Sequence, residues 1–261
     1  METSYRFAVC SDLHLSQKIW THLPILGDSY YSWNQIVQLT IDEGCHALIL
    51  AGDLLDKQIN SSRPVKELVS GLRKLRTADI DVLYVQGQHE YQSVPWMSLS
   101  HARWLHKKPW QLHDLIVACH NASSPFIAGC DYQDAEGLQK FLQSDTARKA
   151  DVLVCHQVWR DFMGDNAKPQ GEFADVPENV RLLITGDFHE AISTKFGNLH
   201  VLSPGSTHLR SISEPEEKSI FIVDFDDHDS SAPFEIMKHV LRTRRRIDLD
   251  SRAFSQTEEL F

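Results

Sequence analysis

Short apolar runs alternate with longer helical stretches along the first third of the chain, and this pattern restricts the fold more than any other feature. The first three runs are Arg6–Cys10, Ala47–Ala51 and Val82–Val85. Helical stretches near Trp33–Glu43 and Pro64–Thr77 separate them, the second opening on a proline suited to a first helical turn. Continuous apolar runs separated by helices are typical of buried strands in an α/β fold.

Strand-like runs are more frequent in the second half. They are Leu115–Ala118, Phe126–Gly129, Val152–Cys155, Leu182–Thr185, Ser219–Phe225 and Phe234–Leu241. Lys195–His200 has the pattern of a hairpin turn, whereas Gln157–Pro177 lacks any period and predicts a long loop. We therefore predict an α/β fold in which two packed mixed β-sheets are flanked by helices in four layers. The domain would span residues 1–249, and residues 250–261 would form a C-terminal tail.

The composition excludes several classes of protein. Hydrophobic residues make up 42% of the chain and no run approaches 18 apolar residues, so we expect a globular protein without a membrane span. Met1–Phe7 lacks a basic stretch followed by an apolar one, which predicts a cytoplasmic protein without a secretion signal. The five cysteines include no C-x-x-C pair, which argues against a disulfide framework. With a net charge of −10, the chain would need metals, a basic patch or a partner to bind DNA.

Polar residues of one chemical kind follow five of the apolar runs. They are Asp12-Leu13-His14, Gly52-Asp53, Gly87-Gln88-His89-Glu90, His156 and Gly186-Asp187-Phe188-His189. The carboxyl ends of strands in open α/β sheets face one crevice, so we expect these side chains to converge. Carboxylate and imidazole ligands without thiolates suit Mn²⁺, Fe or Zn²⁺, and two such ions can clamp a phosphate. One aspartate at a strand end is usually a cap and one histidine a packing residue, but five such coincidences favour a metal site.

The ordered set D-x-H, G-D, G-[QN]-H-[ED], H and G-x-x-H resembles the calcineurin-like metallophosphoesterase family. The resemblance runs from Asp12 to His189 and extends to the turn Pro204-Gly205-Ser206. It implies that the first metal is held by Asp12, His14, Asp53 and His189. It implies that the second is held by Asp53, Gln88, His156 and Asp187.

The same resemblance implies that His89 gives a proton to the leaving oxygen, as a general acid. Asp56 lies where relatives place a carboxylate that orients this histidine, although a helix cap explains Asp56 equally well. Gln88 and Asp187 depart from the family pattern, which has Asn and His there. Both changes fall on the second metal. They favour Mn²⁺, or else Mg²⁺, over Zn²⁺, with Fe also compatible, or they indicate a weak second site.

Four further segments, less specific than the metal-ligand set, are similar to the nuclease subunits of double-strand-break repair complexes, the SbcD type. They are Ser11–Leu15, Ala51–Asp56, Leu153–Gln157 and Arg242–Leu249. This resemblance implies DNA as the substrate, a coiled-coil ATPase as a partner, and a minimal form without the capping domain of relatives.

The arginine run is the one concentrated basic feature. Arg244, Arg245 and Arg246 either contact a phosphate backbone or form a solvated strand end. The acidic tail closed by Leu260-Phe261 is either a docking peptide, for instance for a replication clamp, or a frayed terminus.

Three functions follow from these features. The first is a two-metal-dependent phosphodiesterase, a DNA exonuclease or endonuclease that uses metal-bridged hydroxide. The second is a phosphodiesterase or phosphatase for a small molecule such as a cyclic nucleotide. The third is a binding module with an impaired metal site, as the changes at Gln88 and Asp187 suggest.

Overall fold

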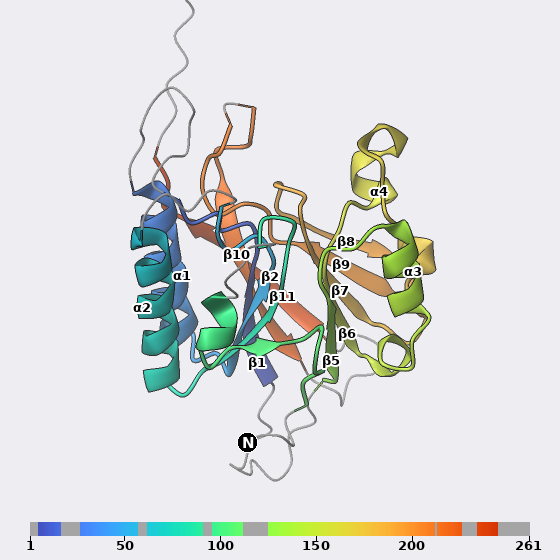
Figure 1. Ribbon diagram of the computed structural model, residues 1–261, viewed down its shortest axis with the longest axis horizontal. Coiled ribbons are helices and arrows are strands. Elements are labelled where there is room, and N and C mark those ends of the chain that lie inside the picture. Colours follow the sequence, from blue (N-terminus) through green and yellow to red (C-terminus); the bar gives the residue numbers. More distant parts are fainter. Residues whose placement is uncertain are drawn as a thin grey trace, which may run out of the picture.

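Two β-sheets lie face to face, with helices on their outer faces (Figure 1). This arrangement confirms the predicted α/β fold of two mixed sheets flanked by helices. The computed structural model describes residues 5–16, 27–56, 62–90, 96–111, 125–211, 213–225 and 234–244.

The first sheet has the order β11-β10-β1-β2-β3-β4. Its strands are β1 (Tyr5–Cys10), β2 (Ala47–Ala51), β3 (Asp81–Val85), β4 (Arg103–Trp104), β10 (Lys218–Phe225) and β11 (Phe234–Leu241). Strands β1 to β4 run parallel, whereas β10 is antiparallel to both β1 and β11. The carboxyl ends of β1, β2 and β3 therefore lie at one edge of the sheet.

The second sheet has the order β5-β6-β7-β9-β8. Its strands are β5 (Ile127–Cys130), β6 (Val152–His156), β7 (Leu182–Gly186), β8 (Ile192–Phe196) and β9 (Leu199–Ser203). Strands β5, β6, β7 and β9 are parallel, and β8 pairs antiparallel with β9 through the predicted hairpin, where Gly197 has a φ of 58°.

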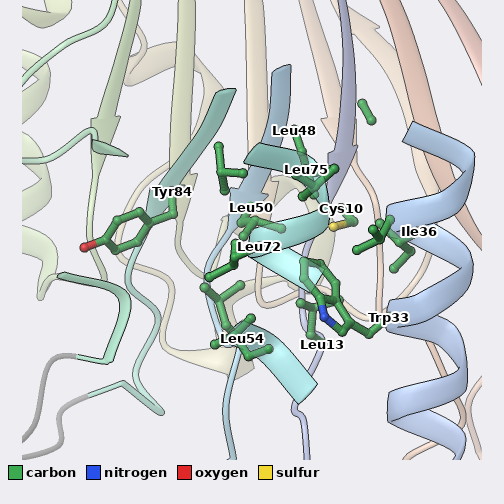
Figure 2. Close-up of a cluster of buried hydrophobic side chains, with 14 of the residues drawn as sticks. Cys10, Leu13, Trp33, Ile36, Leu48, Leu50, Leu54, Leu72, Leu75 and Tyr84 are labelled. Carbon is green, nitrogen blue, oxygen red and sulfur yellow. The ribbon is translucent and has the colours of Figure 1, made fainter. Parts of the chain in front are cut away.

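The helices cover the outer faces of the sheets (Figure 1). They are α1 (Asp28–Asp42), α2 (Arg63–Thr77), α3 (Ala135–Leu142) and α4 (Arg160–Met163), with 3-10 turns at Trp96–Leu99, Ala147–Lys149, Asp165–Ala167 and Phe173–Asp175. Figure 2 shows how α1 and α2 bury Trp33, Ile36 and Leu72 against the first sheet. Helix α1 begins earlier than predicted because Ser29 and Tyr30, at its start, are also buried.

Three separate layers of apolar side chains hold the four layers of backbone together. One lies between the helices α1 and α2 and the first sheet, and another lies beneath α3. The central layer, between the two sheets, includes Phe7, Ile49, Val85, Val154 and Ile184. Because residues of β1, β2 and β3 meet residues of β6 and β7 there, the two sets of strand ends lie close together.

Some predictions need correction or lie outside the described residues. The predicted loop Gln157–Pro177 contains α4 and two 3-10 turns, since Trp159 and Phe173 anchor it to the second sheet. The run Leu115–Ala118 and the tail at 250–261 lie outside the described residues. Among the helices that the structure describes, none has the length and apolar character needed to cross a membrane.

The contact between α1 and α2 yields a test of packing. A methyl group at Gly71 would overlap the buried indole of Trp33, whose Nε1 donates a hydrogen bond to the Glu67 carbonyl. Overpacking of this kind costs about 1–3 kcal/mol, which exceeds the roughly 1 kcal/mol that alanine gains over glycine in a helix. We expect Gly71→Ala to lower the free energy of unfolding in urea, whereas Ser70→Ala, at the exposed neighbouring position, leaves it within about 0.5 kcal/mol. Equal stability of the two variants would contradict this packing.

Candidate metal centre

Five strand ends from the two sheets bring the predicted ligands together. Asp12 and His14 follow β1, Asp53 follows β2 and Gln88 follows β3. From the second sheet, His156 ends β6, and Asp187 and His189 follow β7. Pairing of His156 with Gly186 places these last residues side by side.

Backbone hydrogen bonds continue beyond the strands and hold the first three residues in place. The N–H of Asp12 donates to the Gly52 carbonyl, and the N–H of His14 donates to the Asp53 carbonyl, at 3.1 and 2.9 Å. Glu90 closes this arrangement, because its carboxylate accepts the N–H groups of Asp53 and Gly87 at 3.0 and 2.7 Å. The segments after β1, β2 and β3 therefore form one linked unit.

The backbone at the site adopts an uncommon conformation. Asp12, His14, Asp53 and Asp187 have φ angles of 50°, 38°, 51° and 78°, in the left-handed region. Each such residue costs of the order of 1–3 kcal/mol and persists only where the surrounding structure holds it. A methyl group at Gly87 would collide with the Asp53 carboxylate, so glycine is required there. This concentration of strain at one sheet edge is typical of a functional site.

Two groups of ligand atoms converge around Asp12 and Asp53. In the first, Nε2 of His14 and Nε2 of His189 lie 3.7 and 3.6 Å from Oδ1 of Asp12. In the second, Nε2 of His156 lies 3.5 Å from Oδ2 of Asp53 and 3.8 Å from Oδ1 of Asp187. Oδ2 of Asp53 is also 3.5 Å from Nε2 of His14, so this carboxylate lies between the two groups.

Gln88 and Asp187 contact each other directly. The Gln88 side-chain amide donates to Oδ1 of Asp187 at 2.5 Å, across the two sheets. The backbone N–H of Asp187 in turn donates to Oδ2 of Asp12 at 3.2 Å. With one amide hydrogen used in this way, the side-chain carbonyl oxygen of Gln88 has no hydrogen-bond partner among the described residues.

The unpartnered polar atoms of the site fit bound cations. Asp12 Oδ1, His14 Nε2, His156 Nε2 and Gln88 Oε1 are buried, and none has a hydrogen-bond partner among the described residues. Leaving such groups buried and unpartnered is costly, whereas each is a good metal ligand. The residues Asp12, His14 and His189, and also Asp12, Asp53 and His156, bring their ligand atoms within 4.8 Å of one another.

The electrostatics of the site also favour a cation. Burial disfavours the charged imidazole of His156, yet the carboxylates of Asp53, Asp12 and Asp187 raise its pKa to about 10. Burial, together with the negative charge of Asp53, raises the pKa of Glu90 to about 7. These directions show an excess of negative charge at the meeting point of the two sheets.

His89 and Asp56 form a pair beside the ligand groups. Nδ1 of His89 lies 3.1 Å from Oδ1 of Asp56, and Nε2 of the same ring lies 3.7 Å from Oδ2 of Asp53. The carboxylate of Asp56 can therefore orient the ring, and helix α2 begins at Arg63 with Ser62 as its N-cap. Asp56 is therefore not the N-cap of α2.

A cavity of about 510 Å³ opens over these residues. Its described lining residues are His14, Asp53, Gln88, His89, Met163, Asp187, Phe188, His189, Glu190, Arg210, Ser211, Ser213, Glu214 and Pro215. A hollow that joins the ligand groups to His89 can admit a substrate to both.

Comparison with known proteins identifies the family. Residues 5–191 match the calcineurin-like phosphoesterases. The chain belongs to this family. Members of the calcineurin-like phosphoesterase family are metal-dependent enzymes that use two metals, in accord with the two ligand groups.

Two curated relatives share the name DNA double-strand break repair protein Mre11. The DNA double-strand break repair protein Mre11 of Methanosarcina mazei is 26% identical over 272 residues, which cover 98% of this chain and 42% of that protein. Mre11 of Halobacterium salinarum is also 26% identical, with coverage of 92% and 61%. The chain thus spans about half the length of these relatives.

Solved structures share the calcineurin-like phosphoesterase fold. A dimetal phosphatase from Danio rerio has a TM-score of 0.52 at 12% identity, with coverage of 86% of this chain and 93% of that one. The protein TT1561 of Thermus thermophilus has a TM-score of 0.52 at 14% identity, with coverage of 92% and 100%. At these identities the likeness concerns the fold alone.

Arg244, the member of the arginine run that the structure describes, does not line the cavity. Arg244 is exposed and pairs with Asp28 at the start of α1, at 2.8 Å. Arg245 and Arg246 lie outside the described residues. The basic residue that lines the cavity is instead Arg210, whose guanidinium lies 3.8 Å from Oδ1 of Asp56.

The sequence pattern predicts no role for Glu90, Arg210 or Glu214. Glu90 belongs to the motif Gly87-Gln88-His89-Glu90 after β3, which marks its position. The motif does not show that Glu90 accepts hydrogen bonds from the backbone of Asp53 and Gly87. Arg210 and Glu214 lie on an irregular segment after β9, where neither periodicity nor a strand end marks them. Only the three-dimensional structure brings them to the site.

The bond between Gln88 and Asp187 predicts coupled effects on metal binding. Gln88→Ala and Asp187→Ala should each weaken Mn²⁺ binding to the metal-stripped protein by about 10–100-fold in calorimetric titrations. The double variant should lose less than the product of the two losses, because the residues share one hydrogen bond. The surface pair Gln38–Asp42, with the same bond at 2.8 Å, offers matched control variants that leave affinity unchanged. Independent losses at Gln88 and Asp187 would contradict this coupling.

Proposed function

We propose that this chain is a two-metal-dependent phosphodiesterase that cleaves DNA. The convergence of buried, unpartnered ligand atoms from both sheets is the observation that supports metal-dependent chemistry. Relatives named as DNA double-strand break repair proteins align with 92–98% of the chain, and they support DNA as the substrate.

In this proposal one cation is held by Asp12, His14, Asp53 and His189, and the other by Asp53, Gln88, His156 and Asp187. Divalent cations in such a site supply Lewis acidity, which neutralises phosphate charge and makes water a better nucleophile. The second set has three oxygen donors and one nitrogen, which favours Mn²⁺ over Zn²⁺.

His89 is the proposed proton donor. Asp56 accepts the Nδ1 hydrogen and holds the ring at the cavity, where Nε2 lies 3.7 Å from Oδ2 of Asp53. From there Nε2 can protonate the leaving oxygen of the diester. Asp56 acts through the histidine, so its role is positional.

Arg210 is the proposed contact for the phosphate. Among the described residues that line the cavity, it alone carries a permanent positive charge. Its guanidinium faces Asp56 at 3.8 Å, a distance too long for a strong bond, so it can turn toward an incoming phosphate oxygen. The chain thereby provides a local cation despite its net charge of −10.

A small phosphodiester is the second candidate substrate. The net charge of −10 favours it, because an acidic protein does not attract DNA over long distances. The coiled-coil ATPase and clamp partners stay predictions from the resemblance.

A metal-by-substrate screen tests the proposed function. End-labelled duplex DNA and bis(p-nitrophenyl) phosphate are offered to the purified protein with Mn²⁺, Mg²⁺ or Zn²⁺. We expect Mn²⁺ to support cleavage of both, and a chelator to abolish it. His89→Ala should slow the reaction by about 10²–10⁴-fold, because general-acid catalysis contributes that much.

The outcomes separate the candidates. Turnover of the small diester while DNA stays intact would favour the second candidate. Absence of bound metal together with inactivity toward both substrates would reject enzymatic function and leave a binding module. Equal rates for wild type and His89→Ala would remove the assigned proton donor.

Substitution of the arginines distinguishes a contact in the cavity from one outside it. Arg210→Ala should raise KM for the small diester and for DNA by about tenfold or more, since a hydrogen bond to a charged group contributes about 1.5–3 kcal/mol. Arg244→Ala should leave the small diester unchanged and affect DNA alone, in a salt-dependent way. An unchanged KM in Arg210→Ala would exclude it as the phosphate contact.

A further inference from the structure

The carboxylate of Glu214 accepts hydrogen bonds from four described groups behind the candidate metal centre. Oε1 accepts a bond from Nδ1 of His189 at 2.7 Å. Oε2 accepts bonds from Nζ of Lys218 at 2.8 Å, and from the Ser206 hydroxyl and the Arg210 N–H at 3.1 Å each. One side chain thus links a candidate ligand to the segment that carries Arg210.

Lys218 is the unusual member of this group. Its side chain is 1% exposed at the start of β10, and its ammonium donates to both Glu214 and Ser206. A buried ammonium is costly unless a counter-charge and hydrogen bonds compensate it. Here Glu214 provides that charge, and Lys218 in turn keeps one carboxylate oxygen turned away from His189.

His189 depends on such support more than the other histidines of the centre. The side chains of His14 and His156 are 1% and 0% exposed, so surrounding atoms fix their rings. The side chain of His189 is 29% exposed, and packing leaves its ring free on one side. Its Nδ1 bond to Glu214 is therefore the contact that sets its orientation.

The bond to Glu214 also determines where the ring hydrogen lies. A carboxylate without a proton only accepts, so Nδ1 of His189 must carry the hydrogen. In the neutral ring Nε2 then keeps its lone pair, and it faces Oδ1 of Asp12 at 3.6 Å, the direction that a metal ligand requires.

We infer that Glu214 is the positioning residue for His189, holding the tautomer that presents Nε2 to a metal, with Lys218 as its buried counter-cation. This inference deepens the proposed function and rests on it for the role of His189 as a ligand. The simpler alternative is that Glu214 only anchors the segment between β9 and β10.

Glu214→Gln separates these two roles with little change of volume. The single amide oxygen should turn to the Lys218 ammonium, where the charge makes the stronger bond. The amide NH₂ then faces Nδ1 of His189, which can only accept from it. The ring hydrogen must therefore move to Nε2, which removes the lone pair from the metal side.

Ser206→Ala is the matched control. It removes one hydrogen bond to the same carboxylate and one anchor of the same segment, but leaves the bond between Glu214 and His189 in place. A role limited to anchoring predicts similar effects of the two variants. A positioning role predicts an effect on His189 in Glu214→Gln alone.

The first measurement is ¹⁵N NMR of the histidine rings in the metal-free protein, at a pH where His189 is neutral, with His189→Gln used to assign its signals. We expect hydrogen on Nδ1 in wild type and in Ser206→Ala, and on Nε2 in Glu214→Gln. An unchanged tautomer in Glu214→Gln, or the same change in Ser206→Ala, would overturn the inference.

The second measurement is calorimetric titration of Mn²⁺ into the same proteins. Loss of a partner behind a metal-binding histidine typically weakens affinity by about 10–100-fold, and we expect this in Glu214→Gln alone. Unchanged affinity despite a changed tautomer would show that His189 is not a ligand and would reject the inference. Because neither measurement needs turnover, failure of the DNA-cleavage test leaves both results interpretable.

Discussion

Negative charge buried between two sheets is the constraint on which the rest of this structure depends. Asp12 and Asp53 are almost fully buried, and Asp187 lies beside them at the end of β7. Carboxylates cannot remain ionised in such a place without cations or donors around them. The histidines, the Gln88 amide and nearby N–H groups provide part of this compensation, and bound divalent cations would provide the remainder at the unpartnered ligand atoms. The two-sheet fold is suited to such a site because the ends of strands from both sheets meet there.

Holding these groups together imposes a conformational cost that the core has to offset. Four of the candidate ligands adopt left-handed backbone conformations, and glycine at position 87 is needed because Asp53 occupies the space of a side chain. The apolar layer between the sheets lies directly beneath this strained edge. Hydrogen bonds from Asp12 to Gly52 and from His14 to Asp53 extend the sheet pairing into the strained segments. The apolar layer between the sheets and these hydrogen bonds thus hold the strained residues in place.

Much of the fold and the convergence of the candidate ligands could be predicted because both follow from local patterns. Buried strands read as apolar runs, and Asp12, Asp53, His156 and Asp187 stand where those runs end. The short helix α4 could not be predicted, because four residues give no periodic signal and Trp159 and Phe173 anchor that segment through distant contacts. Arg210 and Glu214 escaped notice for a related reason. Their roles depend on the contact of the irregular segment after β9 with His189, whereas Arg244 of the basic run pairs with Asp28.

The order of the strands explains how the irregular segment between β9 and β10 is held in a defined position. Strand β10 pairs antiparallel with β1 from Phe221 to Phe225, and Asp12 and His14 follow the end of β1. Lys218, the first residue of β10, pairs with Leu241 of β11, so the first sheet holds its backbone. Its ammonium holds Glu214, and Glu214 holds His189 from the other sheet. A chain of charge-assisted bonds thus joins the two sheets behind the centre, where apolar packing between them ends. Through this chain of bonds, β10 of the first sheet also sets the orientation of His189, which follows β7 of the second sheet.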